Sequence, residues 1–106
     1  MNRLNRYFAI VAALLLMASC SNEKVYKALI ITGQNNHQWE QSSPVLKQIL
    51  EETGLFSATI IKTPEQGKDM SGFNPDFSDY ILVVLDYSGD SWPENVKSDF
   101  VSYVSN

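Results

Sequence analysis

The stretch Tyr80–Leu85 reads YILVVL and is followed by Asp86. It is the most strand-like segment of the chain, because it is short, apolar and rich in β-branched residues. Ala28–Thr32 (ALIIT) has the same character and ends at Gly33. Its near-continuous apolarity favours a strand that is covered on both faces. Together with Ser57–Lys62 (SATIIK), these segments predict three strands.

Helical patterns separate the candidate strands. Ser43 before Pro44 is typical of an N-cap and a first helical residue, and Gly54 is typical of the residue after a helix end. Apolar residues at one-turn spacing predict the buried face of this helix: Val45, Leu46, Ile49 and Leu50. A second helix is expected after Ser91–Glu94 (SWPE), which has capping-box spacing. Its predicted buried face holds Val96, Phe100 and Val104.

The order strand, helix, strand, loop, strand, helix predicts an α/β fold with a parallel sheet. The loop Thr63–Asp79 is long and turn-rich, and its Met70, Phe73 and Phe77 are expected to pin it to the domain. A three-stranded sheet with two helices would leave its edges uncovered. We therefore expect a truncated chain, the first part of a larger doubly wound domain that stops after the third strand and its helix. A complete small domain is the alternative.

The N-terminus has the pattern of a targeting segment. Two Arg residues precede the ten-residue apolar run Phe8–Met17, which is too short to cross roughly 30 Å of hydrocarbon as a helix. Ala18 and Ser19 then precede Cys20, an arrangement that resembles a bacterial lipobox. The resemblance implies a signal peptide at 1–19, lipidation of Cys20, a polar tether through residue 26 and a domain at 27–106. It also implies anchoring in the cell envelope of a Gram-negative bacterium, at the periplasmic face or outer surface.

Charge and composition exclude several classes of function. Without residues 1–19, six Lys face twelve acidic side chains, so the net charge is about −6 and there is no basic surface for nucleic acid. One His and one Cys exclude a multi-His metal site, a Cys-rich zinc site and an intrachain disulfide. We expect no resident metal and no cofactor. The residues do not specify an oligomeric state.

Three stretches resemble the ThuA-like (trehalose-utilisation) family: Lys27–Trp39 (KALIITGQNNHQW), Gly67–Phe77 (GKDMSGFNPDF) and Tyr80–Trp92 (YILVVLDYSGDSW). The intervening helix, Ser43–Phe56, fits as well. The resemblance implies a flavodoxin-like, three-layer fold of the class I glutamine amidotransferase type and a role in carbohydrate utilisation. Glutaminase activity is not implied, because this sequence has no second Cys to serve as that nucleophile.

A candidate site follows from the predicted topology. Ligands of open α/β sheets bind at the carboxyl ends of the strands, where the strand order reverses. With strand order 2-1-3, the loops Gly33–Trp39 and Asp86–Trp92 would face each other across one crevice. His37 and Asp86 are the candidate catalytic pair for proton transfer. Each also has a plain alternative, His37 as a hydrogen-bonding loop residue and Asp86, with Asp90, as a ligand of a hard cation.

The candidate ligand-binding residues share these two loops: Gly33, Asn35, Asn36, Trp39, Tyr87, Asp90 and Trp92. The two Asn residues suit sugar hydroxyls but also suit turn formation. The two Trp rings suit sugar stacking, although Trp92 fits a packing role at the helix entry better. Gly33 is expected to serve the backbone, and Asp90 also suits a turn or cap.

Two classes of function stay open at this point. The first is an enzyme that acts on a sugar or glycoside, and the second is a carbohydrate-binding module without chemistry. An inactive truncated copy is a third alternative. A flavin-binding protein ranks below these, because the loop after the first strand is not a Ser/Thr-rich phosphate cradle.

Overall fold

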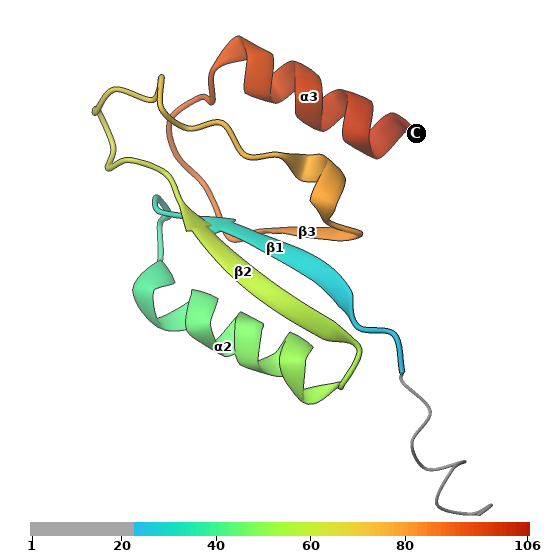
Figure 1. The fold of residues 1–106 in the computed structure, drawn as a ribbon. Coiled ribbons are helices and arrows are strands. Elements are labelled where there is room, and N and C mark those ends of the chain that lie inside the picture. The colour runs from blue at the N-terminus through green and yellow to red at the C-terminus, as the bar shows by residue number, and fades with distance from the viewer. Residues whose placement is uncertain (1–22) are drawn as a thin grey trace, which may run out of the picture.

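The computed structural model describes residues 23–106, so the expected signal peptide and Cys20 lie outside the described residues. Figure 1 shows one helix on each face of a small sheet. The elements are β1 (Tyr26–Thr32), α2 (Trp39–Glu52), β2 (Phe56–Lys62), the 3₁₀ turn η1 (Phe77–Asp79), β3 (Leu82–Leu85) and α3 (Glu94–Ser105). Within residues 23–106, no helix is both long and apolar enough to span a bilayer.

The sheet is parallel and has the order β2-β1-β3, which confirms the predicted fold class. In the register, Ile30 of the central strand lies beside Ile60 on β2 and Val84 on β3. The backbone N–H of Asp86 donates to Ile31 O over 2.9 Å, so the hydrogen bonding of β1 and β3 continues one residue beyond β3. The loops that follow β1 and β3 therefore leave the same edge of the sheet from adjacent strands.

Each face of the sheet has its own apolar core. On the face covered by α2, the fully buried Ala28 and Ile30 of β1 pack with Ala58 of β2. Leu46 and Leu50 of α2 pack against the same cluster. Alternate residues of a strand point to opposite faces. On the second face, the buried residues of the core are Leu29, Ile31, Phe73, Phe77 and Val96. As predicted, the long loop 63–79 is pinned there, with α3 packed outside it (Figure 1).

The prediction for the start of α2 was wrong. The helix begins at Trp39, so Ser43 is not its N-cap and Pro44 lies inside the helix. Pro44 is the sixth residue of the helix, so its missing N–H costs the helix the hydrogen bond that this position would donate to Glu40 O. The hydroxyl groups of Ser42 and Ser43 donate hydrogen bonds to the carboxylate of Asp86, the residue that follows β3, and these bonds anchor this turn of the helix. The predicted end is confirmed, because Gly54 follows the helix with φ of +73°.

Two details of the predicted helical faces were also wrong. Val45 and Ile49 of α2 are 52% and 56% exposed, so the buried stripe is narrower than the predicted face. On α3, Val104 is 60% exposed, and Tyr103 packs against the core instead. The expected capping box is absent, since Pro93 is the N-cap of α3 and makes no side-chain cap bond. The hydroxyl of Ser91 instead accepts a hydrogen bond from Lys97.

Candidate functional site

Three polar side chains form a row where the strands end. Thr32 lies beside Lys62 in the β1–β2 register, and Asp86 follows β3 at the equivalent level. Each is two residues beyond a core residue on the α2 face (Ile30, Ile60 and Val84), so all three lie on that face. The amino end of α2 lies over this row. The fold thus concentrates polar groups at the predicted edge of the sheet.

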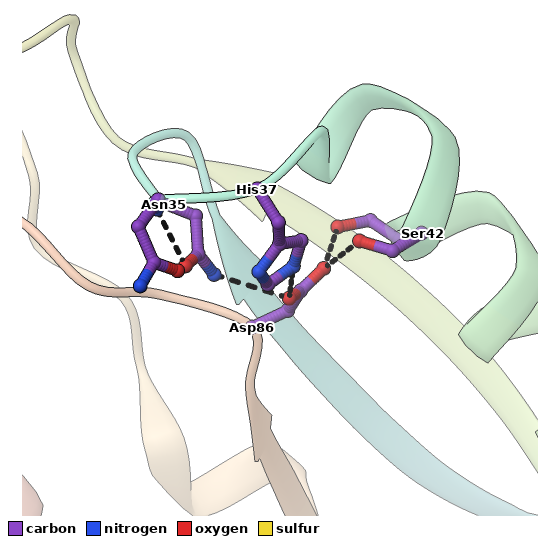
Figure 2. A network of polar contacts seen from close by, with 6 residues as sticks. Asn35, His37, Ser42 and Asp86 are labelled. Carbon is purple, nitrogen blue, oxygen red and sulfur yellow. Dashed lines mark hydrogen bonds and ion pairs between the residues drawn. The ribbon is translucent and has the colours of Figure 1, made fainter.

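Asp86 is the centre of a hydrogen-bond network that joins β3 to the loop after β1 and to α2 (Figure 2). Its Oδ2 accepts from the hydroxyls of Ser43 at 2.6 Å and Ser42 at 2.8 Å. Its Oδ1 lies 2.9 Å from His37 Nε2 and accepts from Asn35 Nδ2 at 3.3 Å. The carboxylate is only 7% exposed, and these four donors replace the water it has lost. We call these five residues the Asp86 network.

The network keeps Asp86 in its charged form. Burial acts to raise the pKa of Asp86, because a carboxylate loses hydration inside a protein. Hydrogen bonds from Ser43, Ser42 and His37, with the charge of His37, act in the opposite direction and leave the pKa below its ordinary value. Asp86 is therefore a stable anion at neutral pH. Such a group orients a neighbour well, but it has no proton to donate and little tendency to accept one.

His37 is the most exposed member of the network. Its side chain is 50% exposed, whereas that of Asp86 is nearly buried. An ionised carboxylate only accepts hydrogen bonds, so Nε2 of His37 must carry the proton that points at Asp86. The neutral imidazole then has Nδ1 as its free acceptor. This arrangement, a carboxylate that fixes a histidine tautomer, is the one that general bases use.

The neighbours of His37 in the loop are held by the backbone and by one another. Gly33 has φ of +122°, and a Cβ there would come within 2.5 Å of Thr63 Oγ1 and 2.7 Å of Thr63 N. Gly33 thus allows the loops after β1 and β2 to touch. Asn35 uses its Nδ2 on Asp86, and its Oδ1 accepts from the backbone N–H of Asn36 at 2.8 Å. Asn36 itself is exposed.

The loop after β3 is closed on itself. Tyr87 donates its hydroxyl to Asp90 O at 2.5 Å, and Asp90 Oδ2 accepts from the backbone N–H of Gly67 at 2.6 Å. Burial and the nearby Asp90 carboxylate raise the pKa of Tyr87, with a smaller opposing effect from Thr63. Trp92 packs in an aromatic cluster, with its ring 5.5 Å from Phe73. Of the predicted ligand-binding residues, these three are therefore engaged within the protein.

Gln34 joins the two loops and was not among the predicted site residues. Its side chain is 5% exposed, donates to Pro64 O at 2.9 Å and accepts from the backbone N–H of Asp90 at 2.8 Å. A Cβ at Gly89 would collide with the same Gln34 side chain. The crevice thus has a fixed floor, which amide hydrogen bonds hold together.

A shallow groove of about 260 Å³ lies above this floor. Trp39, the first residue of α2, forms part of its wall beside Asn35, and the rest of the lining is polar: Gln34, Glu40, Glu65, Gln66 and Ser88. Lys62 Nζ lies 5.7 Å from the centre of the Trp39 ring. We call this space the strand-end groove. It shares Asn35 with the Asp86 network, and His37 stands outside its lining.

A larger cavity, of about 760 Å³, lies elsewhere, between η1 and α3. Its lining includes Asp76, Asp99 and Asn106 and shares no residue with the Asp86 network. Size alone is a poor guide here, so we place the candidate site at the strand ends, where the buried charge lies. Within residues 23–106, no group of three or more His, Cys, Asp or Glu side chains could hold a metal ion.

Sequence reasoning found the acid and the imidazole but missed the hydroxyl donors. The local sequence predicts a helix cap at Ser43, and nothing local marks Ser42. Their signal is long-range, since both bind a carboxylate more than forty residues away. The sequence marks Thr32 only as the end of a strand.

Comparison with known proteins finds a solved structure that is similar to this chain. No protein-family model matches the chain, and no curated protein matches it. The chain is similar to a crystal structure of a protein from Parabacteroides merdae ATCC 43184 that is described as ThuA-like, with 62% sequence identity and a TM-score of 0.75. The match covers 76% of this chain and 29% of that protein. Over the matched residues the chain is similar to this ThuA-like protein in both sequence and fold, and it spans less than a third of that protein's length.

Proposed function

We propose that the crevice at the strand ends binds a carbohydrate and that His37 exchanges a proton with a hydroxyl or glycosidic oxygen of that ligand. The observation that carries the proposal is the half-exposed imidazole held by a buried carboxylate at 2.9 Å. In this proposal the two predicted catalytic residues have different tasks. His37 transfers the proton, and Asp86 fixes its tautomer and offsets its positive charge.

The division of tasks follows from the hydrogen bonds. Asp86 accepts from four donors and has a lowered pKa, so it has little tendency to take up a proton. The Nδ1 atom of His37, in contrast, makes no hydrogen bond to another described residue. The strand-end groove next to it offers amides, carboxylates and one indole face, a combination that suits sugar hydroxyls and the apolar face of a sugar ring.

Turnover of p-nitrophenyl glycosides by the full chain tests this proposal. His37→Gln should abolish release of p-nitrophenolate while the circular dichroism spectrum persists. Asp86→Asn should lower kcat and leave KM nearly unchanged, because the substitution disturbs the orientation of His37 rather than the binding of the ligand. Gln38→Ala is the matched control, since Gln38 is exposed in the same loop and makes no side-chain cap bond. Equal rates for His37→Gln and wild type would refute the role of His37.

A non-catalytic carbohydrate-binding module is the second candidate. It is favoured by the groove itself, whose lining contains Trp39 and Asn35 but not His37. In that case sugars bind with no turnover, and Trp39→Ala weakens binding while His37→Gln leaves it unchanged. Isothermal titration of these two variants with the same sugar separates the candidates.

We further propose that the mature chain is a lipoprotein of the cell envelope, anchored through Cys20. The basic start, the short apolar run and the small residues before Cys20 support this. Two or three acyl chains on one Cys anchor a protein stably, at about 0.8 kcal/mol per buried CH₂ group. Expression with labelled palmitate should label the wild type and not Cys20→Ser. Label in the variant, or none in either protein, would contradict the proposal.

A further inference from the structure

The edge of the sheet at which the three strands begin exposes apolar side chains. Val25 and Leu55 are each 52% exposed, and Ile81 is 62% exposed. These residues come immediately before β1, β2 and β3 in the chain. Tyr26, the first residue of β1, is 36% exposed beside them. We call these four residues the amino-edge patch. Because all three strands are parallel, the patch lies at the opposite end of the sheet from the candidate site (Figure 1).

Backbone hydrogen bonds hold the patch together. The N–H of Tyr26 donates to Leu55 O over 2.8 Å, and the N–H of Ile81 donates to Lys27 O over 3.0 Å. The bonding of β1 to both neighbours therefore begins within the patch, so its side chains come from adjacent backbones about 4.8 Å apart. An exposed apolar surface on a rigid backbone, rimmed by polar groups, is typical of an interaction surface.

The charged and aromatic groups at this edge narrow the kind of partner. Lys24 Nζ lies 5.2 Å from the centre of the Tyr26 ring, and both Lys24 and Lys27 are exposed. Tyr and Lys combine an apolar body with a polar tip, the combination found at membrane–water interfaces. Exposed acidic side chains close to the patch in the chain outnumber the two Lys: Glu23, Glu51, Glu52 and Asp79. Contact with lipid would therefore depend on the apolar side chains and not on attraction to anionic headgroups.

The patch also lies close to the proposed lipid anchor. Residues 20–25 separate the start of β1 from the acyl chains, and six residues span at most about 22 Å when fully extended. A tether of this length holds the start of β1 near the bilayer. The seven residues of β1 extend about 23 Å, so the carboxyl ends of the strands lie that much further along the sheet.

We propose that the amino-edge patch is the surface on which the protein rests against a phospholipid bilayer. The proposal rests on the lipid anchor at Cys20 that is part of the proposed function. Val25, Leu55 and Ile81 contact the headgroup region, as the apolar face of an interfacial protein segment does. The strand-end groove and His37 then face away from the membrane, and their ligand arrives from the aqueous side.

Photo-crosslinking in intact Gram-negative cells tests this orientation. Benzoylphenylalanine replaces Val25, Leu55 or Ile81 of the full chain, one position at a time, in cells whose phospholipids carry radioactive phosphate. The acyl chains on a lipidated Cys carry no phosphate, so radioactivity on the protein after illumination reports contact with phospholipid. We expect labelling at all three positions. Val45 is the matched control, because it is the same residue type as Val25 with the same 52% exposure, but it lies in the first half of α2, toward the opposite edge of the sheet. Labelling at Val45 should remain at background.

Leu55 and Ile81 decide the outcome, because Val25 is close to the anchor in any orientation. Labelling at Val25 alone, equal labelling at Val45, or crosslinks from the patch to a protein in place of phospholipid would each overturn the proposal. No labelling at the patch would overturn it whether or not Cys20 carries palmitate.

The same cells separate this proposal from that of the anchor. Cys20→Ser should lose both palmitate and the crosslinks at Leu55 and Ile81. Palmitate on the wild type without crosslinks at the patch would retain the anchor and refute the resting surface. Crosslinks at Leu55 and Ile81 in a protein without palmitate would refute the anchor and retain the surface.

Discussion

Replacement of Asp86 by Asn tests the central element of the site. Asn keeps one oxygen and replaces the other with an NH₂ group. If the oxygen faces Ser42 and Ser43, the NH₂ group meets two donors, His37 Nε2 and Asn35 Nδ2, and both of these bonds are lost. The opposite orientation sets the NH₂ group against the two hydroxyls. Either way the carboxylate charge is lost inside a network built for it.

The magnitude follows from the geometry of the bonds. A hydrogen bond to a charged group contributes about 1.5–3 kcal/mol. The bond from Asn35 is long at 3.3 Å and His37 is half exposed, so both lie at the weak end of this range. We expect Asp86→Asn to lower the free energy of unfolding by about 2–4 kcal/mol, a large share of the roughly 5–15 kcal/mol of a small domain.

Urea denaturation of the full chain, followed by circular dichroism, measures this loss. Asp99→Asn is the control, because Asp99 is an exposed carboxylate on α3. A change at Asp86 of less than about 0.5 kcal/mol, the scale of surface substitutions, would refute the network as a stabilising element.

The same variant has a pH signature. In the unfolded chain the pKa of Asp86 is about 3.9. In the folded protein the pKa of Asp86 lies below that value. The stability that Asp86 contributes is therefore fully present at pH values above the unfolded-state pKa, and it is lost as the pH falls through the folded-state pKa. Wild type should lose more stability on acidification below about pH 4 than Asp86→Asn does. Parallel acid profiles for the two proteins would contradict the lowered pKa.

Four further substitutions test the surroundings of Asp86, with Gly72→Ala as a control. Ser43→Ala should lower the free energy of unfolding by about 2 kcal/mol, because Ser43 is 1% exposed and its partner would be left without a donor. Ser42→Ala should lower it by only about 1 kcal/mol, because water can replace the hydroxyl of the less buried Ser42. Equal losses in urea denaturation would contradict this difference. Gly33→Ala should cost about 2–5 kcal/mol from positive φ and contact with Thr63, whereas Gly72→Ala, with nothing within 4 Å, should be nearly neutral by thermal denaturation. His37→Ala should cost only about 1 kcal/mol, and a much larger loss would assign His37 to the fold rather than to ligands.

The sheet was predictable because its signals are local. Tyr80–Leu85, Ala28–Thr32 and Ser57–Lys62 are apolar runs, and each overlaps an observed strand. The end of α2 was predictable for the same reason, since a single glycine with positive φ, Gly54, follows the helix. The position of the crevice followed from the parallel order of the strands and required no knowledge of side chains.

The start of α2 was not predictable, because the relevant interaction is distant in sequence. Pro44 favours a helix that starts beside it, whereas the bonds of Ser42 and Ser43 to Asp86 hold residues of the earlier turn. The site has the same limitation. His37 and Asp86 carry recognisable chemistry, but the unpaired hydroxyl of Thr32 is evident only when the space around it is known.

The Asp86 network also has a consequence for the order in which the chain folds. Its donors precede Asp86 by 43 to 51 residues, so each bond closes a long loop and pays the entropy of doing so. The packing of α2 on β1 and β2 involves much shorter separations and can form first. The amino-terminal turns of α2 therefore acquire their final bonds only when β3 pairs with β1. In this protein the Asp86 network and the pairing of β3 with β1 form in one step.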